Sequence, residues 1–197
     1  MKTVPPSISD QKYTYADYLR WTFEESVELI KGKMFKMAPA PNLRHQEVSG
    51  NLYFLLKSFL WKKQCRVFSA PFDVRLPSRR EERTDETITT VVQPDLCVIC
   101  DPAKLDARGC LGAPDLIVEI LSPATSTKDL RDKYQAYESA GVTEYWVIHP
   151  HEETLQIFLL NESGQYEGNT LPYVREDTVP VHTLPGLQIH LDDVFSL

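Results

Sequence analysis

Pro114-Asp115-Leu116-Ile117-Val118-Glu119-Ile120-Leu121 is a short apolar run with a glutamate near its middle. Apolar residues occupy both faces of the strand that this run predicts, which is typical of a central strand in a sheet covered on both sides. Alternation places Glu119 on the same face as Ile117. A carboxylate is costly to bury unless it meets a cation or a hydrogen-bond donor, so Glu119 requires a partner. Asp115, which follows a proline, is expected to serve only as a strand-start residue.

A second carboxylate and a lysine are candidates for this partnership. Asp95 stands at the head of a neighbouring strand expected over 91–100, and Lys133 lies on a helix expected over 128–140. Because helical spacing places Lys133 on the face toward the sheet, we expect its ammonium to point toward Glu119. Two carboxylates beside an ammonium can hold a divalent cation next to a phosphate, whereas a buried Glu–Lys pair can also simply hold the helix to the sheet.

The pattern of apolar residues elsewhere predicts an α/β or α+β fold. Helical periodicity marks 45–63, and Thr14 is a suitable cap for a short helix over 15–21. We expect one domain over residues 1–197 with a loose tail over 1–12, built on a mixed central sheet flanked by helices with extra strands at both ends. Strands are predicted over 26–37 as a hairpin, and over 65–76, 91–100, 114–121, 144–148, 155–160, 166–170 and 178–182.

Composition limits the function classes. The chain has 197 residues and a net charge of -7, whereas most nucleic-acid-binding proteins carry a basic surface. A negative net charge still allows a local basic cleft. The sequence shows no N-terminal signal pattern and no apolar run long enough to span a bilayer. We therefore expect a cytoplasmic protein with no membrane partner.

The four cysteines are Cys65, Cys97, Cys100 and Cys110. The Cys-x-x-Cys motif that two of them form can be half of a zinc site or a redox pair. Its place in a predicted strand argues against both, because residues three apart point to opposite faces, and no second Cys or His pair with suitable spacing follows. We expect structural thiols in a reducing compartment.

Four segments together carry a family resemblance. They are Val-Gln-Pro-Asp-Leu at 92–96, Gly-Ala-Pro-Asp-Leu-Ile-Val-Glu-Ile-Leu-Ser-Pro at 112–123, Asp-x-x-x-Lys at 129–133 and Ala-Gly-Val-x-Glu-Tyr-Trp at 140–146. In this combination the chain resembles the Uma-type restriction endonuclease family of the PD-(D/E)xK nuclease superfamily. The resemblance implies a restriction-endonuclease-like core.

The resemblance also implies a set of site residues. Asp95 and Glu119 would be metal ligands, and the long first helix would bring in a further acidic or histidine group, here His45 or Glu47. Glutamate in a first helical turn also serves to complement the helix dipole, so these two additions stay open. Because Mg²⁺ prefers oxygen ligands, a backbone carbonyl near Ile120 would complete a suitable set with these carboxylates, for Mg²⁺ or for Mn²⁺ in its place.

The chain departs from the superfamily pattern at one position. The Glu-x-Lys slot reads Glu119-Ile120-Leu121, with leucine where lysine is expected. The resemblance suggests that Lys133 supplies the ammonium instead.

These observations lead to one function and one alternative. We expect a metal-dependent endonuclease that hydrolyses DNA phosphodiester bonds, acting as a homodimer so that two sites address two strands. The alternative is a catalytically inactive nuclease-fold domain that binds nucleic acid or a protein partner. The acidic balance and Leu121 favour the alternative, whereas the intact set of Asp95, Glu119 and Lys133 favours activity.

Overall fold

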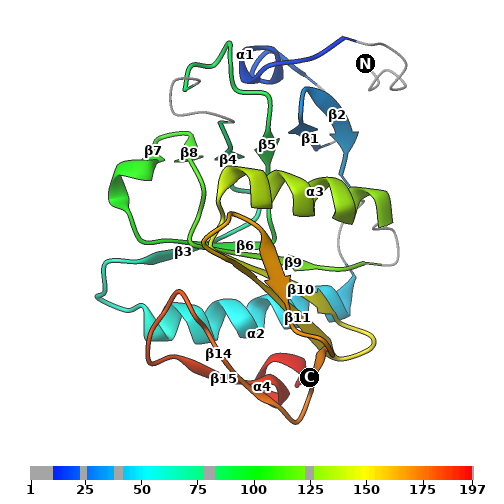
Figure 1. The fold of residues 1–197 in the computed structure, drawn as a ribbon, viewed down its shortest axis with the longest axis vertical. Helices are drawn as coiled ribbons and strands as arrows, with labels where there is room; N and C mark the ends of the chain where they lie inside the picture. The colour runs from blue at the N-terminus through cyan, green and yellow to red at the C-terminus, as the bar shows by residue number, and fades with distance from the viewer. Residues whose placement is uncertain (1–10, 23–25, 38–41, 78–82, 123–126, 197) are drawn as a thin grey trace.

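The structure is a computed structural model that describes residues 11–22, 26–37, 42–77, 83–122 and 127–196, without the side chains of 127–129. Most of the expected tail over 1–12 therefore lies outside the described residues. In the described part of the chain, a large sheet has helices above and below it, and a second sheet lies beyond the upper helix (Figure 1). No helix in these ranges is long and apolar enough to cross a membrane.

The large sheet has the strand order β12-β11-β10-β9-β6-β3, with β13 pairing with β11. β9 and β10 are parallel and are joined through a helix, whereas the other pairs are antiparallel, so the expected mixed central sheet is confirmed. The strands are β3 (Arg66–Ser69), β6 (Leu96–Ile99), β9 (Leu116–Ile120), β10 (Glu144–His149), β11 (Thr154–Leu160), β12 (Tyr166–Gly168) and β13 (Tyr173–Val174).

Two helices cover the two faces of this sheet (Figure 1). Helix α2 (Leu43–Phe59), capped by the Asn42 side chain, packs with Val118 and its same-face neighbours in one core cluster. Helix α3 (Thr127–Ala140) packs with Ile117 in the other cluster. The alternation expected along β9 is thus present, and it directs Glu119 to the α3 side.

The remaining elements extend both ends of the core. Below α2 lie the β14–β15 hairpin and α4, and beyond α3 lies the second sheet in the order β2-β1-β5-β4-β8-β7 (Figure 1). The bounds are α1 (Tyr15–Tyr18), β1 (Val27–Ile30), β2 (Lys33–Lys36), β4 (Val74–Arg75), β5 (Val91–Val92), the 3₁₀ turn η1 (Pro102–Lys104), β7 (Leu105–Asp106), β8 (Gly109–Leu111), β14 (Thr178–Pro180), β15 (Gln188–His190) and α4 (Leu191–Phe195).

Two segments predicted as single strands are each divided between the two sheets. The segment 65–76 forms β3 and β4, and the segment 91–100 forms β5 and β6. Pro71 and Pro94 stand at the breaks, and a proline cannot donate a ladder hydrogen bond. The predictions of continuous strands were therefore wrong, and the division places Asp95 where the chain passes from one sheet to the other.

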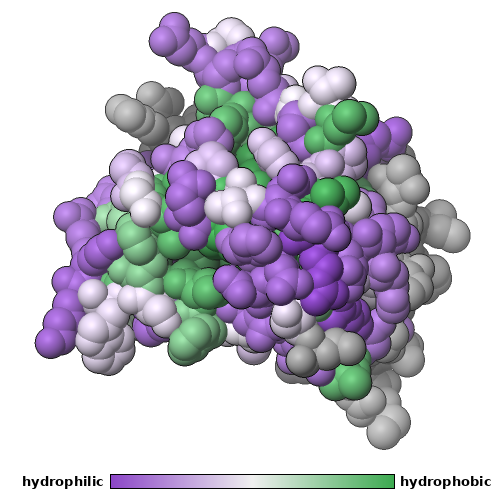
Figure 2. Space-filling view, turned by 90° about the horizontal axis from the view of Figure 1, so that it is seen from below, coloured by the Kyte–Doolittle hydropathy of each residue, from purple (hydrophilic) through white to green (hydrophobic). Residues whose placement is uncertain are grey.

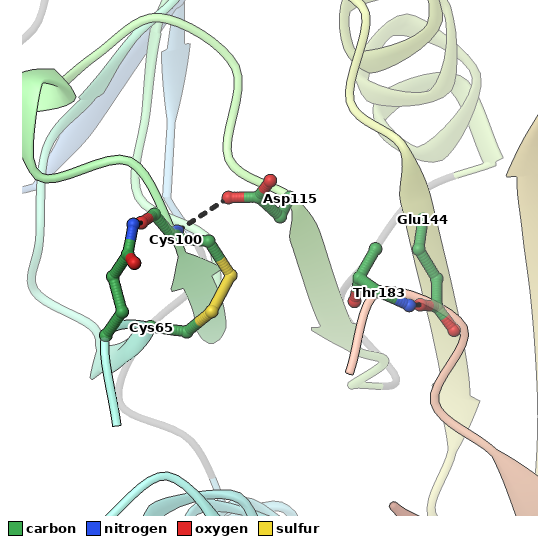
Figure 3. Close-up of a disulfide and its surroundings, with 6 residues drawn as sticks. Cys65, Cys100, Asp115, Glu144 and Thr183 are labelled. Atoms are coloured by element: carbon green, nitrogen blue, oxygen red, sulfur yellow. Dashed lines mark hydrogen bonds between the residues drawn. A yellow bond between two sulfur atoms is a disulfide. The ribbon is translucent and has the colours of Figure 1, made fainter. Parts of the chain in front are cut away.

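The expectation of four free structural thiols was also wrong for one pair. Cys65 and Cys100 form a disulfide between the ends of β3 and β6 (Figure 3). Cys97 and Cys110 remain buried thiols whose pKa values are raised by burial. The Asp115 carboxylate accepts a hydrogen bond from the Cys100 backbone N–H at 2.7 Å, which is consistent with its expected strand-start role.

Candidate active site

Asp95 lies at the head of β6, directly beside β9. Leu96 pairs with Val118, and continuing this register by one residue places Asp95 opposite Glu119. The Asp95 Oδ2 atom accepts a hydrogen bond from the Ile120 backbone N–H at 2.7 Å. This bond fixes the carboxylate at the sheet end, with about a fifth of its side chain exposed.

Glu119 meets two donors from helix α3. The Lys133 Nζ atom lies 3.0 Å from Glu119 Oε1 and 3.1 Å from Oε2, and the Tyr137 hydroxyl donates to Oε1 at 2.6 Å. Lys133 and Tyr137 lie one helical turn apart on α3, so both face the sheet. The expectation that the Lys133 ammonium points toward Glu119 is confirmed.

Glu28 belongs to the same cluster as Asp95, Glu119 and Lys133, and it is not among the site residues predicted from the sequence. It lies on β1, is almost fully buried, and its Oε1 atom is 3.0 Å from Lys133 Nζ. The signal that would have found it is the one used for Glu119, since Val27-Glu28-Leu29-Ile30 also places a carboxylate within an apolar strand. One ammonium thus lies between two carboxylates that come from different sheets.

Gln93, which precedes Pro94 and Asp95, forms hydrogen bonds through both its backbone and its side chain. Its backbone N–H donates to Glu28 Oε1 at 2.8 Å, and its side-chain Nε2 donates to Asp73 Oδ1 at 2.9 Å. The Tyr18 hydroxyl also donates to Asp73 Oδ1, at 3.2 Å. Gln93 therefore holds the break between the two sheets in place, directly before Asp95.

The cluster carries more negative than positive charge, and this shows in its pKa values. Burial raises the pKa of Glu119 to about 7, with Asp95 and Glu28 adding to the shift and Lys133 opposing it. For Lys133, burial lowers the pKa, but the carboxylates of Glu119 and Glu28 outweigh burial and raise it above its ordinary value. The ammonium therefore stays charged while Glu119 holds a proton up to near-neutral pH.

His45 joins the cluster from the opposite face of the sheet. Its Nε2 atom lies 3.3 Å from Asp95 Oδ1, and its buried Nδ1 atom has no hydrogen-bond partner among the described residues. Burial lowers the pKa of His45, but the hydrogen bond and the charge of Asp95 outweigh it, so that the net shift is upward. His45 is thus a positively charged or hydrogen-bonding neighbour of Asp95.

Glu47 is not brought to this cluster. It lies two residues beyond His45 on α2, so its side chain leaves the helix on a different side. There it lines a surface pocket together with Arg44, Glu153 and Arg175. The structure therefore joins His45, but not Glu47, to the predicted carboxylates.

The oxygen atoms at this site are of the type that a hard divalent cation prefers as ligands. Two carboxylates and the Ile120 carbonyl offer oxygen atoms, and the excess negative charge would be relieved by a cation. No group of three or more His, Cys, Asp or Glu side chains in the described ranges is arranged as a ready metal cluster. The oxygens of Glu119 are engaged by Lys133 and Tyr137, so a cation would have to share Glu119 with the ammonium.

Known proteins resemble the chain over nearly its whole length. The sequence model of the family Uma2, described as "Putative restriction endonuclease", matches residues 15–192. A protein of Synechocystis sp. (strain PCC 6803), described as uncharacterized protein slr1290, is 22% identical over 193 residues, which cover 96% of this chain and 95% of that protein. A crystal structure from Anabaena variabilis ATCC 29413, described as "a putative nuclease belonging to DUF820", matches with a TM-score of 0.72 at 21% identity, covering 93% of this chain and 98% of that one.

Proposed function

This chain belongs to the Uma2 family, and from that membership we propose that it is a metal-dependent endonuclease that hydrolyses phosphodiester bonds in DNA. The observation that carries the proposal is Glu119 in the central sheet, opposite Asp95, with the Lys133 ammonium 3.0 Å from its carboxylate. A structural ion pair alone explains neither Asp95 at the same sheet end nor the surplus of carboxylates around one ammonium.

Each residue has a proposed role. Asp95, Glu119 and the Ile120 carbonyl would hold Mg²⁺ or Mn²⁺, which when bound supplies a Lewis acid and a water of lowered pKa. Lys133 stabilises negative charge that develops on the phosphodiester, because its ammonium is held in place before the reaction. Tyr137 orients Glu119 through its hydrogen bond.

The test is cleavage of supercoiled plasmid DNA by the full chain with Mg²⁺, with Mn²⁺ and with EDTA. We expect nicked and linear products only with metal, and their loss in Asp95→Asn, because the amide keeps the shape of the ligand but removes its charge. A thermal melt of Asp95→Asn establishes that it is folded. Cleavage that persists in EDTA, or in the folded variant, would overturn the proposal.

Metal affinity should depend on pH because Glu119 must lose its proton to act as a ligand. With a pKa of about 7, Glu119 is mostly protonated at pH 6 and mostly charged at pH 8. We expect Mn²⁺ affinity to rise from pH 6 to pH 8, by about tenfold per unit well below that pKa, and to level off above it. Calorimetric titration at several pH values measures this, and affinity that is flat from pH 6 to 8 would contradict it. Glu119→Gln is the control that should lose this rise.

One alternative function has its own support. Leu121 occupies the slot of the superfamily lysine, and both oxygens of Glu119 already have protein donors. An inactive nuclease-fold domain that binds nucleic acid or a protein partner fits these two features. In the plasmid assay this alternative predicts a shift of DNA mobility with no cleavage under any metal condition.

DNA is the proposed substrate, and the cytoplasm is the proposed compartment. A homodimer is proposed as the working form.

A further inference from the structure

One side of helix α2 exposes large apolar side chains. Leu43 is 75% exposed and Phe54 is 68% exposed, although Leu52 on the opposite side of the helix is completely buried. Trp61, in the turn that follows the helix, is also 68% exposed. Viewed from below, where α2, α4 and the β14–β15 hairpin lie in Figure 1, hydrophobic surface is grouped beside strongly hydrophilic surface (Figure 2). Exposed apolar residues that share one face of a helix are typical of a protein interface.

On a helix with 3.6 residues per turn, positions two, five and nine residues to either side of Leu52 lie on the face opposite it. Gly50 and Phe54 stand two positions to either side of Leu52, and Leu43 stands nine positions before it. Trp61 stands nine positions after Leu52, two residues beyond the end of the helix. A two-fold axis perpendicular to the helix at Leu52 would therefore bring each residue opposite its counterpart in a second, antiparallel copy.

The charges on this side follow the same symmetry. Glu47 and Lys57 stand five positions to either side of Leu52, so the axis would bring opposite charges together twice. Lys57 is exposed, whereas Glu47 is half-buried, with its Oε2 atom buried and without a hydrogen-bond partner in the described ranges. A parallel pairing of the helices would instead bring Glu47 to Glu47 and Lys57 to Lys57, which is repulsive.

The shapes are also complementary at the centre. A Cβ atom added at Gly50 would meet nothing within 4 Å, so the surface there is open and has no side chain. The counterpart of Gly50 is Phe54, whose ring projects from the helix and is 68% exposed. The ring of one copy can thus lie over the bare backbone of the other, and this contact occurs twice about the axis.

We propose that the chain forms a two-fold symmetric dimer through antiparallel packing of α2 against α2 of a second copy. The interface consists of an α2 face with Leu43, Glu47, Gly50, Phe54 and Lys57, together with Trp61 in the turn after the helix. Such an interface is self-complementary and closes at two copies. His45 contacts Asp95 on the other side of the same helix, so both candidate active sites would remain open. The proposal does not depend on nuclease activity, and each can fail without the other.

The test is the oligomeric state of the full chain by sedimentation velocity over a range of concentrations. We expect a species of about twice the 22.6 kDa of one chain. Phe54→Glu should weaken the dimer by about 100-fold or more, because it places a charge at the centre of the interface. Leu171→Glu is the matched control, since it changes a residue that is 78% exposed but lies outside α2, and it should leave the dimer intact.

Charge reversal distinguishes the antiparallel dimer from non-specific association through the exposed apolar residues. Glu47→Lys and Lys57→Glu should each weaken the dimer by about tenfold, and the double exchange should restore it. Thermal melts establish that each variant is folded. A wild-type chain that stays monomeric at high micromolar concentration, a dimer that survives Phe54→Glu, or a double exchange without rescue would each overturn the proposal.

Discussion

Glu119→Gln is expected to abolish metal-dependent DNA cleavage, with a loss of about 100-fold or more, while the protein stays folded. Losing one charged ligand of a catalytic cation removes several kcal/mol of transition-state stabilisation, and each ~1.4 kcal/mol is tenfold in rate. Folding should be affected little, by about 1 kcal/mol or less at pH 8. The reason is that Glu28 still lies 3.0 Å from the Lys133 ammonium and remains its counter-ion.

The measurements are a plasmid-cleavage time course and urea unfolding with and without Mn²⁺. Glu144→Gln is the matched control, because Glu144 is a fully buried glutamate on the adjacent strand β10 that accepts from the backbone N–H of Thr183 at 2.8 Å (Figure 3). That variant should lose roughly 1–3 kcal/mol of stability yet keep cleavage. If Glu119→Gln instead loses stability by several kcal/mol, and the wild type shows no response to metal, the carboxylate is structural and the nuclease proposal fails.

Lys133→Met should be the most destabilising single change in the cluster at alkaline pH. It removes the ammonium between Glu28 and Glu119 and leaves two buried carboxylates without a cation, which costs about 3–5 kcal/mol. The pKa of Glu119, about 7 in the wild type and 4.5 in its ordinary state, should rise further. Because the folded state then holds a proton that the unfolded state releases, the deficit should shrink as the pH falls from 8 to 5.

Urea unfolding of Lys133→Met and of the wild type at pH 5 and pH 8 measures this difference. Mn²⁺ provides a second readout, since a cation between the carboxylates would restore part of the lost stability at pH 8 without restoring the role of the ammonium in cleavage. A deficit that is equal at both pH values would show that Lys133 contributes through packing of its chain, and a full rate of cleavage would exclude it from the chemistry.

Several features of the protein could be determined from the sequence by itself. The central strand followed from an apolar run that occupies both faces of a sheet. The helix expected over 128–140 matches α3, after which Gly141 has a φ of +85°. The pairing of Lys133 with Glu119 followed from the cost of burying a carboxylate and from helical spacing. These are local properties, because periodicity and burial cost act along one element or between two neighbouring elements.

Other features were decided only by the tertiary structure. Glu28 carries the same signal as Glu119, but only the packing of the second sheet on α3 brings it to the Lys133 ammonium, about a hundred residues away in the chain. The breaks at Pro71 and Pro94 divide strands between two sheets, and the disulfide joins Cys65 to Cys100 rather than leaving four thiols. His45 reaches Asp95 whereas Glu47 does not, because a helix with 3.6 residues per turn directs two nearby side chains to different sides, and only docking decides which side meets the site.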